Sequence, residues 1–509
     1  SIPNKIESFL APFISDFITF DPSCLATAPY KINSSLSIMY ALDEIGERQV
    51  PSKVLSKLLS AKASEYVLAS LMFRKILSKD DTLAGKVFLT SGLGGMSGAQ
   101  PKAGNIAGCI TVCAEVNPKA AKKRHEQGWV DVLIDDIDVL TKRVREAQQH
   151  NEVISIAYIG NVVEVWEHFY NEDIFIHLGS DQSSLHIPWT GGYYPVDLSF
   201  EDSNILIREH PKLFKEKVQA SLKRHVDAIN KHTQKGTYFF DYGNAFLLEA
   251  SRAGADIMAK NNIDFRYQSY VQDILGPLCF DYGFGPFRWV CASGNPEDLD
   301  KTDHIAAAIL EDLMLSAPED IQLQMQDNIT WIKNAKQNNM VVGSQARILY
   351  ADAEGRSKIA IAFNDAISKG EIGPVVLGRD HHDVSGTDSP YRETSNIYDG
   401  SRFTADMAIH NVIGDSFRGA TWVSIHNGGG VGWGEVINGG FGMLLDGTAE
   451  ADKRIKNMLF YDVNNGISRR SWARNEGAIF AIKREMERTP NLKVTVPNLV
   501  DDDLLEGLF

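Results

Sequence analysis

The sequence predicts an α/β protein whose central feature is a doubly wound parallel sheet. At Gly85 a polar segment of helical pattern gives way to short apolar runs that alternate with helical stretches. The first two runs, 86–91 and 110–116, are separated by a glycine-dense turn and an alanine-rich helical stretch. A strand, glycine loop, helix and strand in this order form a parallel βαβ unit, which a doubly wound sheet extends.

The same alternation continues after the second run. We expect a helix near 118–127, a strand at 130–135, a helix near 137–149 and a strand at 153–160. From about 200 to 260 the pattern is mostly helical. These segments make a chain of crossover units, as a doubly wound sheet requires.

Changes in composition and hydrophobic pattern divide the chain into three predicted parts. Residues 1–83 are polar, nearly free of glycine and helical in pattern; residues 84–261 contain the doubly wound sheet; residues 262–509 are mixed, with glycine-rich loops between apolar segments. A length of 509 residues suits two to four domains.

Composition excludes several classes of protein. Hydrophobic residues at 44% and charged residues at 23% are ordinary globular values. The net charge of -15 has no basic block, which argues against a nucleic-acid or anionic-membrane surface but allows a small anionic substrate. No apolar run could span a bilayer, the start shows no signal peptide, and five cysteines suit a reducing compartment. We therefore expect a cytosolic enzyme.

The first candidate site is the glycine loop SGLGGMSGAQ, residues 91–100. Gly92, Gly94 and Gly98 follow a strand and open a helix, where backbone N–H groups favour a diphosphate. Glu115 closes the next strand, where a carboxylate can accept hydrogen bonds from a ribose. The spacing GxGxxxG is not the strict fingerprint, so a tight helix–sheet contact that needs small residues is the alternative.

Two further segments gather polar and aromatic residues after apolar runs. In GSDQSSLHIPWTGGYYP, residues 179–195, polar side chains crowd where an α/β sheet places its ligand, although a solvated loop would have a similar composition. In FFDYGNAF, residues 239–246, Tyr242 lies within an aromatic cluster that could equally be ordinary core.

Arg288 stands between Phe287 and Trp289, in a stretch too apolar for a surface arginine. A buried arginine must be paired, and one in a pocket can bind a carboxylate through two hydrogen bonds. An internal salt bridge is the alternative. Cys291 is nearby, but no positioned base indicates a nucleophile.

The segment GRDHHDVSGTDSPYRETSN, residues 378–396, concentrates titratable groups outside any helix or strand period. It indicates a site with tuned acid and base groups, or else a divalent metal site. Arg379 and Arg392 would repel a cation, which argues against the metal. A last segment, 419–440, ends a β-rich run in His426, Asn427 and three glycines, which lets backbone approach a flat or anionic group closely.

Five of these motifs, in this order, resemble the urocanate hydratase (urocanase) family in its animal-type form: SGLGGMSGAQPKAGNIAG, GSDQSSLHIPW, FGPFRWVCASG, GRDHHDVSGTDSPYRETSN and ATWVSIHNGGGVGWG. The resemblance runs from about Leu83 to the C-terminus. It implies a core domain, of which 1–83 would be the N-terminal helical part, with an inserted Rossmann-like NAD-binding domain. It also implies a cytosolic homodimer in histidine degradation, which hydrates urocanate with a tightly bound NAD that acts as an electrophile.

The resemblance also assigns residues. Arg288 would grip the urocanate carboxylate, and Asp380 would be the general acid/base, with His381 and Arg392 beside it. The residues implied to hold NAD are Gly95, Met96, Ser97, Glu115, Asn161, Val162, Gln182, Ser183, Ser184, Leu185, His186, Tyr193, Tyr194, Tyr242 and Gly428. No metal is implied.

This chain departs from the family's pattern in three places. The cysteine of bacterial members corresponds to Leu349 in QARILY, so thiol chemistry there is not expected. An arginine expected shortly after Glu115 is absent, and Lys119 or Lys122 could supply its charge. Residues 30–88 contain neither a Tyr-Gly-Gly nor a Tyr-Gly-Gln-Met-Thr-Ala-Gly-Ser motif, so we expect part of the family's N-terminal segment to be missing.

Three alternatives to urocanate hydration remain. One is an NAD-assisted hydratase of a modified urocanate, which would retain Arg288. Another is a non-catalytic relative that serves as a binding protein, suggested by the missing segment. The third is a metal-dependent hydrolase that uses the cluster at 380–393.

Overall fold

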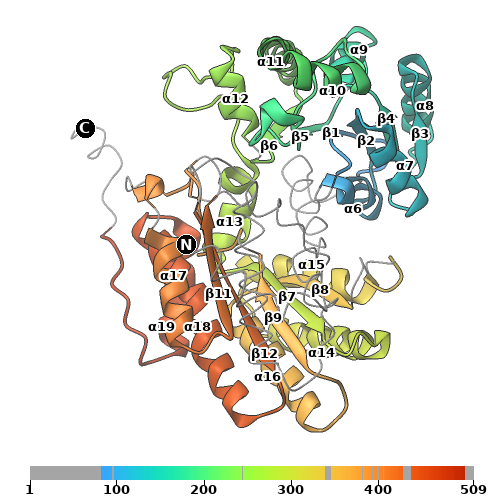
Figure 1. Ribbon diagram of the computed structural model, residues 1–509. Helices are drawn as coiled ribbons and strands as arrows, with labels where there is room; N and C mark the ends of the chain where they lie inside the picture. Colours follow the sequence, from blue (N-terminus) through green and yellow to red (C-terminus); the bar gives the residue numbers. More distant parts are fainter. Residues whose placement is uncertain are drawn as a thin grey trace, which may run out of the picture.

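The computed structural model describes residues 82–94, 97–243, 245–338, 345–380, 382–390, 394–397, 401–404, 406–427 and 437–498. These residues form two lobes, each built on a six-stranded sheet (Figure 1). The prediction of a helical first part falls on residues that lie almost entirely outside the described ones.

The first lobe contains the predicted doubly wound sheet. Its strands are β1 (Val87–Ser91), β2 (Ile110–Glu115), β3 (Val132–Ile134), β4 (Ile154–Ile159), β5 (Leu178–Asp181) and β6 (Tyr238–Asp241). They lie in the order β3-β4-β2-β1-β5-β6, and every neighbouring pair is parallel. The prediction of an α/β fold with this sheet is confirmed.

One strand of this lobe was not predicted. Residues 200–260 are mostly helical, as expected, but residues 238–241 within them form the edge strand β6. A run of three aromatic residues after Gly236 is short enough for a strand and too short for a helix.

The helices of the first lobe cover both faces of its sheet. They are α6 (Gln100–Ala107), α7 (Pro118–Glu126), α8 (Ile137–Gln149), α9 (Val162–Asn171), α10 (Phe200–Glu209), α11 (Pro211–Gln234) and α12 (Phe246–Arg252), with short turns at Ser97–Ala99 and Pro188–Thr190. Alternate strand residues such as Val87, Leu89, Ile110 and Val112 pack against α8, α9 and α11 in one core cluster. Residues of the opposite parity therefore face α6, α7 and the second lobe.

The second lobe is built on an antiparallel sheet. Its strands are β7 (Gly285–Cys291), β8 (Ala346–Ala351), β9 (Val375–Arg379), β10 (Thr387–Asp388), β11 (Trp422–Asn427) and β12 (Ile437–Leu445). The order is β10-β12-β9-β7-β8, and β11 also pairs with β12. The helices are α13 (Gly276–Leu278), α14 (Pro296–Met314), α15 (Glu319–Asn334), α16 (Ala353–Ser368), α17 (Asp406–Phe417), α18 (Ala449–Trp472) and α19 (Glu476–Arg488), with short helical turns at Val271–Leu275, Phe280–Tyr282 and Ser401–Phe403.

A hydrophobic cluster joins the two lobes. Phe88, Leu178 and Phe240 from the first sheet pack in it with Phe284 and Tyr350 of the second lobe. Because these side chains are buried in one cluster, the two lobes share an apolar interface. In the described part of the chain, no helix combines the length and apolar character needed to cross a membrane.

The proposed domain boundary at 261/262 stays a prediction. Met258 and Phe265 form an isolated bridge on either side of it, and Tyr267 still packs against the core of the first lobe.

Candidate active site

The carboxyl ends of β1 and β5 meet at the position where the strand order of the first sheet reverses. Ser91 is the last residue of β1 and Asp181 the last of β5. The Ser91 hydroxyl donates a hydrogen bond of 2.6 Å to Asp181 Oδ2 and accepts one of 3.1 Å from the Gln182 backbone N–H. Burial raises the pKa of the Asp181 carboxyl above its usual value. Such a reversal is where doubly wound sheets bind their ligands.

The predicted cofactor loop 182–186 starts from this Ser91–Asp181 contact. The Ser183 hydroxyl donates to Asp181 Oδ2 at 3.1 Å, and the Ser184 backbone N–H donates to the Gly192 carbonyl at 2.9 Å. Gln182 and Leu185 are buried, whereas Ser183, Ser184 and His186 are partly exposed. The sequence places this loop, with Asp181, after a strand, but Ser91 was given no role in the site; the signal for Ser91 is a polar residue at the end of a buried strand.

The glycine loop after β1 is fixed by Arg124 of α7. Arg124 Nε donates to the Leu93 carbonyl at 3.1 Å, and Nη2 donates to the Gly94 carbonyl. A Cβ atom at Gly98 would lie 2.2 Å from Arg124 Nε, so this glycine is required by packing against the arginine. Gly95 and Met96, predicted to hold NAD, lie outside the described residues; Ser97 is buried and accepts from the Gly94 N–H at 3.0 Å.

Glu115 lies at the end of β2, where a carboxylate that accepts hydrogen bonds from a ribose was expected. Its two carboxylate oxygens accept backbone hydrogen bonds from Leu93 at 2.7 Å and Asn117 at 2.8 Å. Burial raises the pKa of Glu115, and the nearby Arg124 partly offsets this. Lys119 and Lys122 are exposed, so Arg124 is the buried cation beside Glu115. Glu115 thus links the two loops that precede α6 and α7.

Of the remaining predicted cofactor residues in the first lobe, one caps a helix and others lie in the hydrophobic core. Asn161 caps α9 by accepting from the Val163 N–H at 3.0 Å and donates to the Tyr194 carbonyl at 3.0 Å. The Tyr193 side chain lies in the hydrophobic core, with its hydroxyl 3.2 Å from His225 Nδ1. Val162, Leu185 and Tyr193 all belong to this core cluster.

In the second lobe the structure pairs two of the predicted catalytic residues, Arg288 and Asp380, directly. Arg288 of β7 lies opposite Gly378 of β9, and Asp380 is the first residue after β9, two positions beyond Gly378. Arg288 Nη2 forms an ion pair with Asp380 Oδ2, and the side chains are only 13% and 14% exposed. Asp380 Oδ1 accepts from the His382 backbone N–H at 3.2 Å. Arg288 Nε is buried without a hydrogen-bond partner among the described residues.

Tyrosines connect this pair with the first lobe. Tyr242, which follows β6, stacks on Tyr270 with ring centroids 5.3 Å apart. Tyr350 of β8 interacts electrostatically with both Tyr270 and Asp380, and burial raises its pKa well above the usual value. The predicted cofactor residue Tyr242 and the Arg288–Asp380 pair therefore lie along the same boundary between the lobes. Leu349 points into the hydrophobic core of the second lobe on the opposite face of the sheet, so its position does not face Asp380.

Three other titratable groups in the described part of 378–396 have structural partners. Arg379 Nε donates to Asp462 at 2.9 Å, Asp383 pairs with Arg356, and Asp388 accepts from the Ala408 N–H at 2.7 Å. No group of three or more His, Cys, Asp or Glu residues that could hold a metal is found within the described ranges. The predicted residues His381, Arg392 and Gly428 lie outside them. Arg379 and Asp383 thus belong to a buried network of charges with Arg356 and Asp462.

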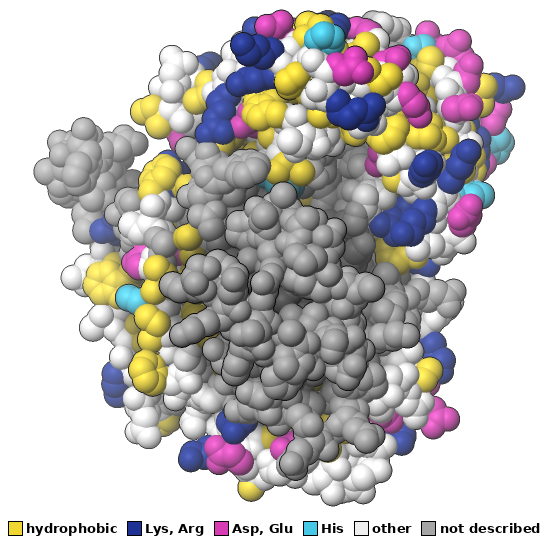
Figure 2. Space-filling view, in the orientation of Figure 1, with side chains coloured by type: hydrophobic (Ala, Val, Ile, Leu, Met, Phe, Trp, Pro, Cys, Tyr) yellow, Lys and Arg dark blue, Asp and Glu magenta, His cyan; other side chains and the backbone are white. Residues whose placement is uncertain are grey.

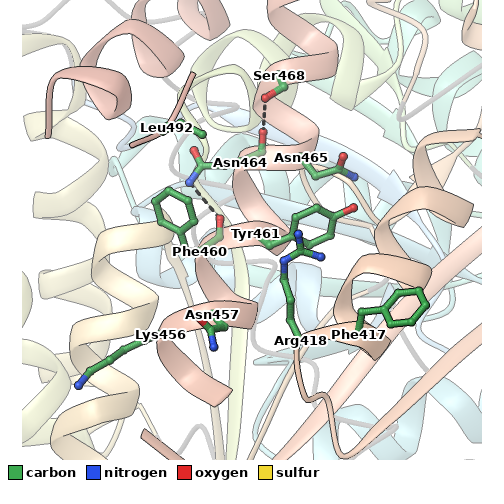
Figure 3. A pocket seen from close by; sticks show the side chains of 10 residues that line it. All are labelled: Phe417, Arg418, Lys456, Asn457, Phe460, Tyr461, Asn464, Asn465, Ser468 and Leu492. Carbon is green, nitrogen blue, oxygen red and sulfur yellow. Dashed lines mark hydrogen bonds between the residues drawn. The ribbon is translucent and has the colours of Figure 1, made fainter. Parts of the chain in front are cut away.

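A cavity of about 670 Å³ lies elsewhere, along α17 and α18 (Figure 3). Arg418 stacks on Tyr461 within it, with the guanidinium carbon 3.9 Å from the ring centroid. None of the residues predicted from the sequence lines this cavity, so it is separate from the candidate active site. Figure 2 shows acidic and basic side chains interspersed over the visible face of the upper lobe, without a continuous basic surface.

Comparisons with known proteins give one consistent result. A family model described as the urocanase Rossmann-like domain matches residues 66–274, and one described as the urocanase C-terminal domain matches residues 277–484. The chain is 56% identical to urocanate hydratase of Mus musculus over 432 residues, which cover 83% of this chain and 64% of the relative. It is 55% identical to urocanate hydratase of Homo sapiens over 439 residues, covering 84% and 65%. A probable urocanate hydratase of Caenorhabditis elegans is also 55% identical, with the same coverages of 84% and 65%. The chain thus spans slightly less than two thirds of the length of these relatives.

Proposed function

The chain belongs to the urocanase family, and we propose that it is a urocanate hydratase, a hydro-lyase that adds water to urocanate to give 4-imidazolone-5-propanoate in histidine degradation. The observation that carries the proposal is the Arg288–Asp380 pair at the boundary between the lobes. It puts a carboxylate-binding cation and a proton-transferring carboxyl side by side in a largely buried place.

NAD is the proposed cofactor, and the first lobe supplies surroundings that fit it. The reversal point between β1 and β5, the glycine loop and the partly exposed polar residues of 182–186 are the parts that a dinucleotide site requires. Glu115, with each carboxylate oxygen able to accept a second hydrogen bond, suits the ribose. When bound, NAD supplies an electrophilic ring toward the imidazole of the substrate.

The residues of the chain have distinct proposed roles. Arg288 binds the substrate carboxylate, because a guanidinium offers two parallel donors to a carboxylate. Asp380 gives or takes a proton at the imidazole or at water. Tyr242, Tyr270 and Tyr350 keep bulk water from the space between the lobes, since all three side chains are buried. His381 and Arg392 are proposed to lie beside Asp380, on the resemblance alone.

The remaining assignments also rest on the resemblance. We propose a two-subunit assembly in the cytosol. The four cysteines that the structure describes are buried free thiols, which agrees with a reducing compartment. Sedimentation of the purified protein at two concentrations would measure the subunit number.

Loss of the ultraviolet absorbance of urocanate tests the activity, using the protein purified without added cofactor. We expect consumption by the wild type, and a loss of about a hundredfold to a thousandfold in kcat/KM for Arg288→Ala, because a buried carboxylate would lose its charged partner. Asp380→Asn should retain NAD while turnover collapses. No consumption even with NAD supplied would refute the proposal, and consumption of only a ring-modified urocanate would redirect it to that substrate.

A further inference from the structure

A short segment of the first lobe, residues 192–196, connects two loops at the carboxyl edge of the sheet, and we call it the bridging segment. The Gly192 carbonyl accepts a hydrogen bond of 2.9 Å from the Ser184 backbone N–H, and a Cβ atom at Gly192 would lie only 2.1 Å from the Ser184 carbonyl oxygen. The Tyr194 carbonyl accepts a hydrogen bond of 3.0 Å from Asn161 Nδ2. Ser184 follows β5 and Asn161 follows β4, and β2 and β1 lie between these strands in the sheet. The bridging segment therefore joins the loops on either side of β2 and β1.

The bridging segment lies beside two carboxyl groups of the candidate cofactor site. Burial raises the pKa of Tyr193, and Asp181 at the end of β5 raises it further. Burial also raises the pKa of Tyr194, with a contribution from Glu115 at the end of β2. Each tyrosine is thus close enough to one of the two carboxyl groups to interact with it electrostatically. A shift of the bridging segment would move the loop 182–186 relative to Glu115.

Helix α11 holds the bridging segment from the side of the hydrophobic core. Ser221 Oγ accepts a hydrogen bond of 2.9 Å from the Val196 backbone N–H, and one turn later His225 Nδ1 lies 3.2 Å from the Tyr193 hydroxyl. His225 is fully buried against the Phe246 ring, and burial lowers its pKa from the ordinary 6.5 to about 3, so the imidazole is neutral near pH 7. In the described part of the chain, the contact with Tyr193 is the one hydrogen bond found for this imidazole.

We propose that His225 is a positioning residue of the cofactor site, which fixes the bridging segment through Tyr193 and so slows the dissociation of NAD. The inference rests on the proposed function and adds to it a residue that does not touch the cofactor. The side chains of His225 and Tyr193 are both buried, so they act through the backbone of the bridging segment. Without their contact the buried hydroxyl lacks a partner, which favours displaced positions of the segment.

Exchange of bound NAD for isotopically labelled NAD tests this role. The NAD-loaded protein is mixed with an excess of labelled NAD at about pH 7.5, and the rate at which the label enters the protein gives the dissociation rate of the bound cofactor. Tyr193→Phe removes the hydroxyl with little change in shape, and His225→Leu removes its partner. We expect each variant to exchange NAD about tenfold faster than the wild type, the effect of losing one hydrogen bond of a buried group. Tyr193→Phe, the milder change, decides the test if His225→Leu does not fold.

A double variant and a second histidine of α11 separate this role from general stability. Tyr193→Phe combined with His225→Leu should exchange NAD no faster than either single variant, because both substitutions remove the same contact. His232, two turns after His225, is also buried, and its Nε2 lies 2.8 Å from the Trp166 carbonyl. His232→Leu should lose a comparable hydrogen bond and keep the wild-type exchange rate. Wild-type exchange in the two single variants, additive effects in the double variant, or equally fast exchange in His232→Leu would each overturn the role of His225.

Turnover of urocanate, measured on the same preparations, distinguishes this inference from the proposed function. Turnover by the wild type, with unchanged NAD exchange in Tyr193→Phe and His225→Leu, would keep the function and overturn the role of His225. Faster exchange in these variants, without turnover by the wild type, would overturn the function and keep the role. A wild type that binds no NAD, even when NAD is supplied, would overturn both.

Discussion

Arg356 of α16 binds Asp383 through two hydrogen bonds, Nη1 to Oδ2 and Nη2 to Oδ1, each 2.9 Å long, and both side chains are buried. Arg356 Nη1 also lies 3.2 Å from Asp462 Oδ2, and Asp462 in turn accepts from Arg379. Burial, with the neighbouring Asp462, raises the pKa of Asp415, a carboxyl next to this network, well above its usual value. Arg356 and Arg379 are thus paired with Asp383 and Asp462 in one buried network, and Arg379 also donates to the main-chain carbonyl of Asp380.

Replacing Arg356 should destabilise the second lobe strongly. In Arg356→Met, Asp383 would keep only the more distant Arg379 Nε, at 3.6 Å, as a cationic partner. We expect the free energy of unfolding to fall by about 3–5 kcal/mol, as for other broken buried ion pairs. Urea denaturation followed by tryptophan fluorescence measures it. The exposed Lys333–Glu311 pair supplies the control, since Lys333→Met should leave the midpoint unchanged. Similar midpoints for the two variants would contradict a stabilising network.

The sequence predicts the first lobe far better than the candidate site. Strands such as 110–115 and 154–159 are mostly apolar and buried on both faces. Asn117 and Asp136 each mark the start of a helix, so the local sequence pattern agrees with the tertiary structure. The strand 238–241 escaped prediction because four residues between two helices carry too little periodicity.

The partners of the charged site residues could not be predicted, because they come from distant parts of the chain. Arg288 and Asp380 are separated by 92 positions and meet only through the antiparallel register of β7 and β9. Arg379 and Asp383 belong to the titratable cluster seen in the sequence, but they pair with Asp462 of α18 and Arg356 of α16 in a structural network. Similarly, Lys119 or Lys122 was expected to supply the positive charge near Glu115. The structure instead shows Arg124, further along the same helix, in contact with the glycine loop.

Loss of the Ser91 hydroxyl should weaken NAD binding with only a modest effect on stability. The hydroxyl joins Asp181 Oδ2 to the Gln182 N–H and so sets where the loop 182–186 begins. We expect Ser91→Ala to lower NAD affinity by about 5–30-fold, which corresponds to roughly 1–2 kcal/mol for a hydrogen bond to a buried carboxyl. Isothermal titration with NAD after removal of bound cofactor measures this change.

Ser155 provides a matched control for Ser91. Its hydroxyl donates to Asp131 Oδ2 at 2.8 Å, a similar serine–aspartate contact near the amino end of β4. Ser155→Ala should lose comparable stability and keep its NAD affinity. An equal loss of affinity in both variants would mean that Ser91 acts through general stability and not through the loop.

Arg124 should be required for cofactor retention, in contrast to the lysines on the same helix. It binds the Leu93 and Gly94 carbonyls, so Arg124→Met would release the glycine loop and remove the positive charge beside Glu115. We expect the NAD content per purified chain, measured by release with acid and chromatography, to fall by at least about tenfold. Lys122→Met, at an exposed position of α7, should retain the wild-type content. Full NAD content in Arg124→Met would show that the loop holds its shape without the arginine.

The pH dependence of stability should contain a contribution from Asp388. Burial raises the pKa of this carboxyl from its ordinary 3.8 to about 6, although it accepts a hydrogen bond from the Ala408 N–H. The folded state therefore binds a proton more tightly than the unfolded state. The resulting stabilisation is complete below about pH 3.8 and is lost as the pH rises through about 6.

Asp388→Asn isolates this contribution, because the amide keeps an acceptor for the Ala408 N–H and does not ionise. Relative to the wild type, the variant should gain about 3 kcal/mol of unfolding free energy between pH 4 and pH 8, since two pKa units correspond to roughly that amount. Urea denaturation across this range measures the difference. Asp365→Asn, at an exposed position of α16, should show the same pH dependence of the unfolding free energy as the wild type. A constant difference between Asp388→Asn and the wild type would contradict a buried carboxyl that ionises near pH 6, and a difference that shrinks with rising pH would mean that the folded protein favours the ionised form.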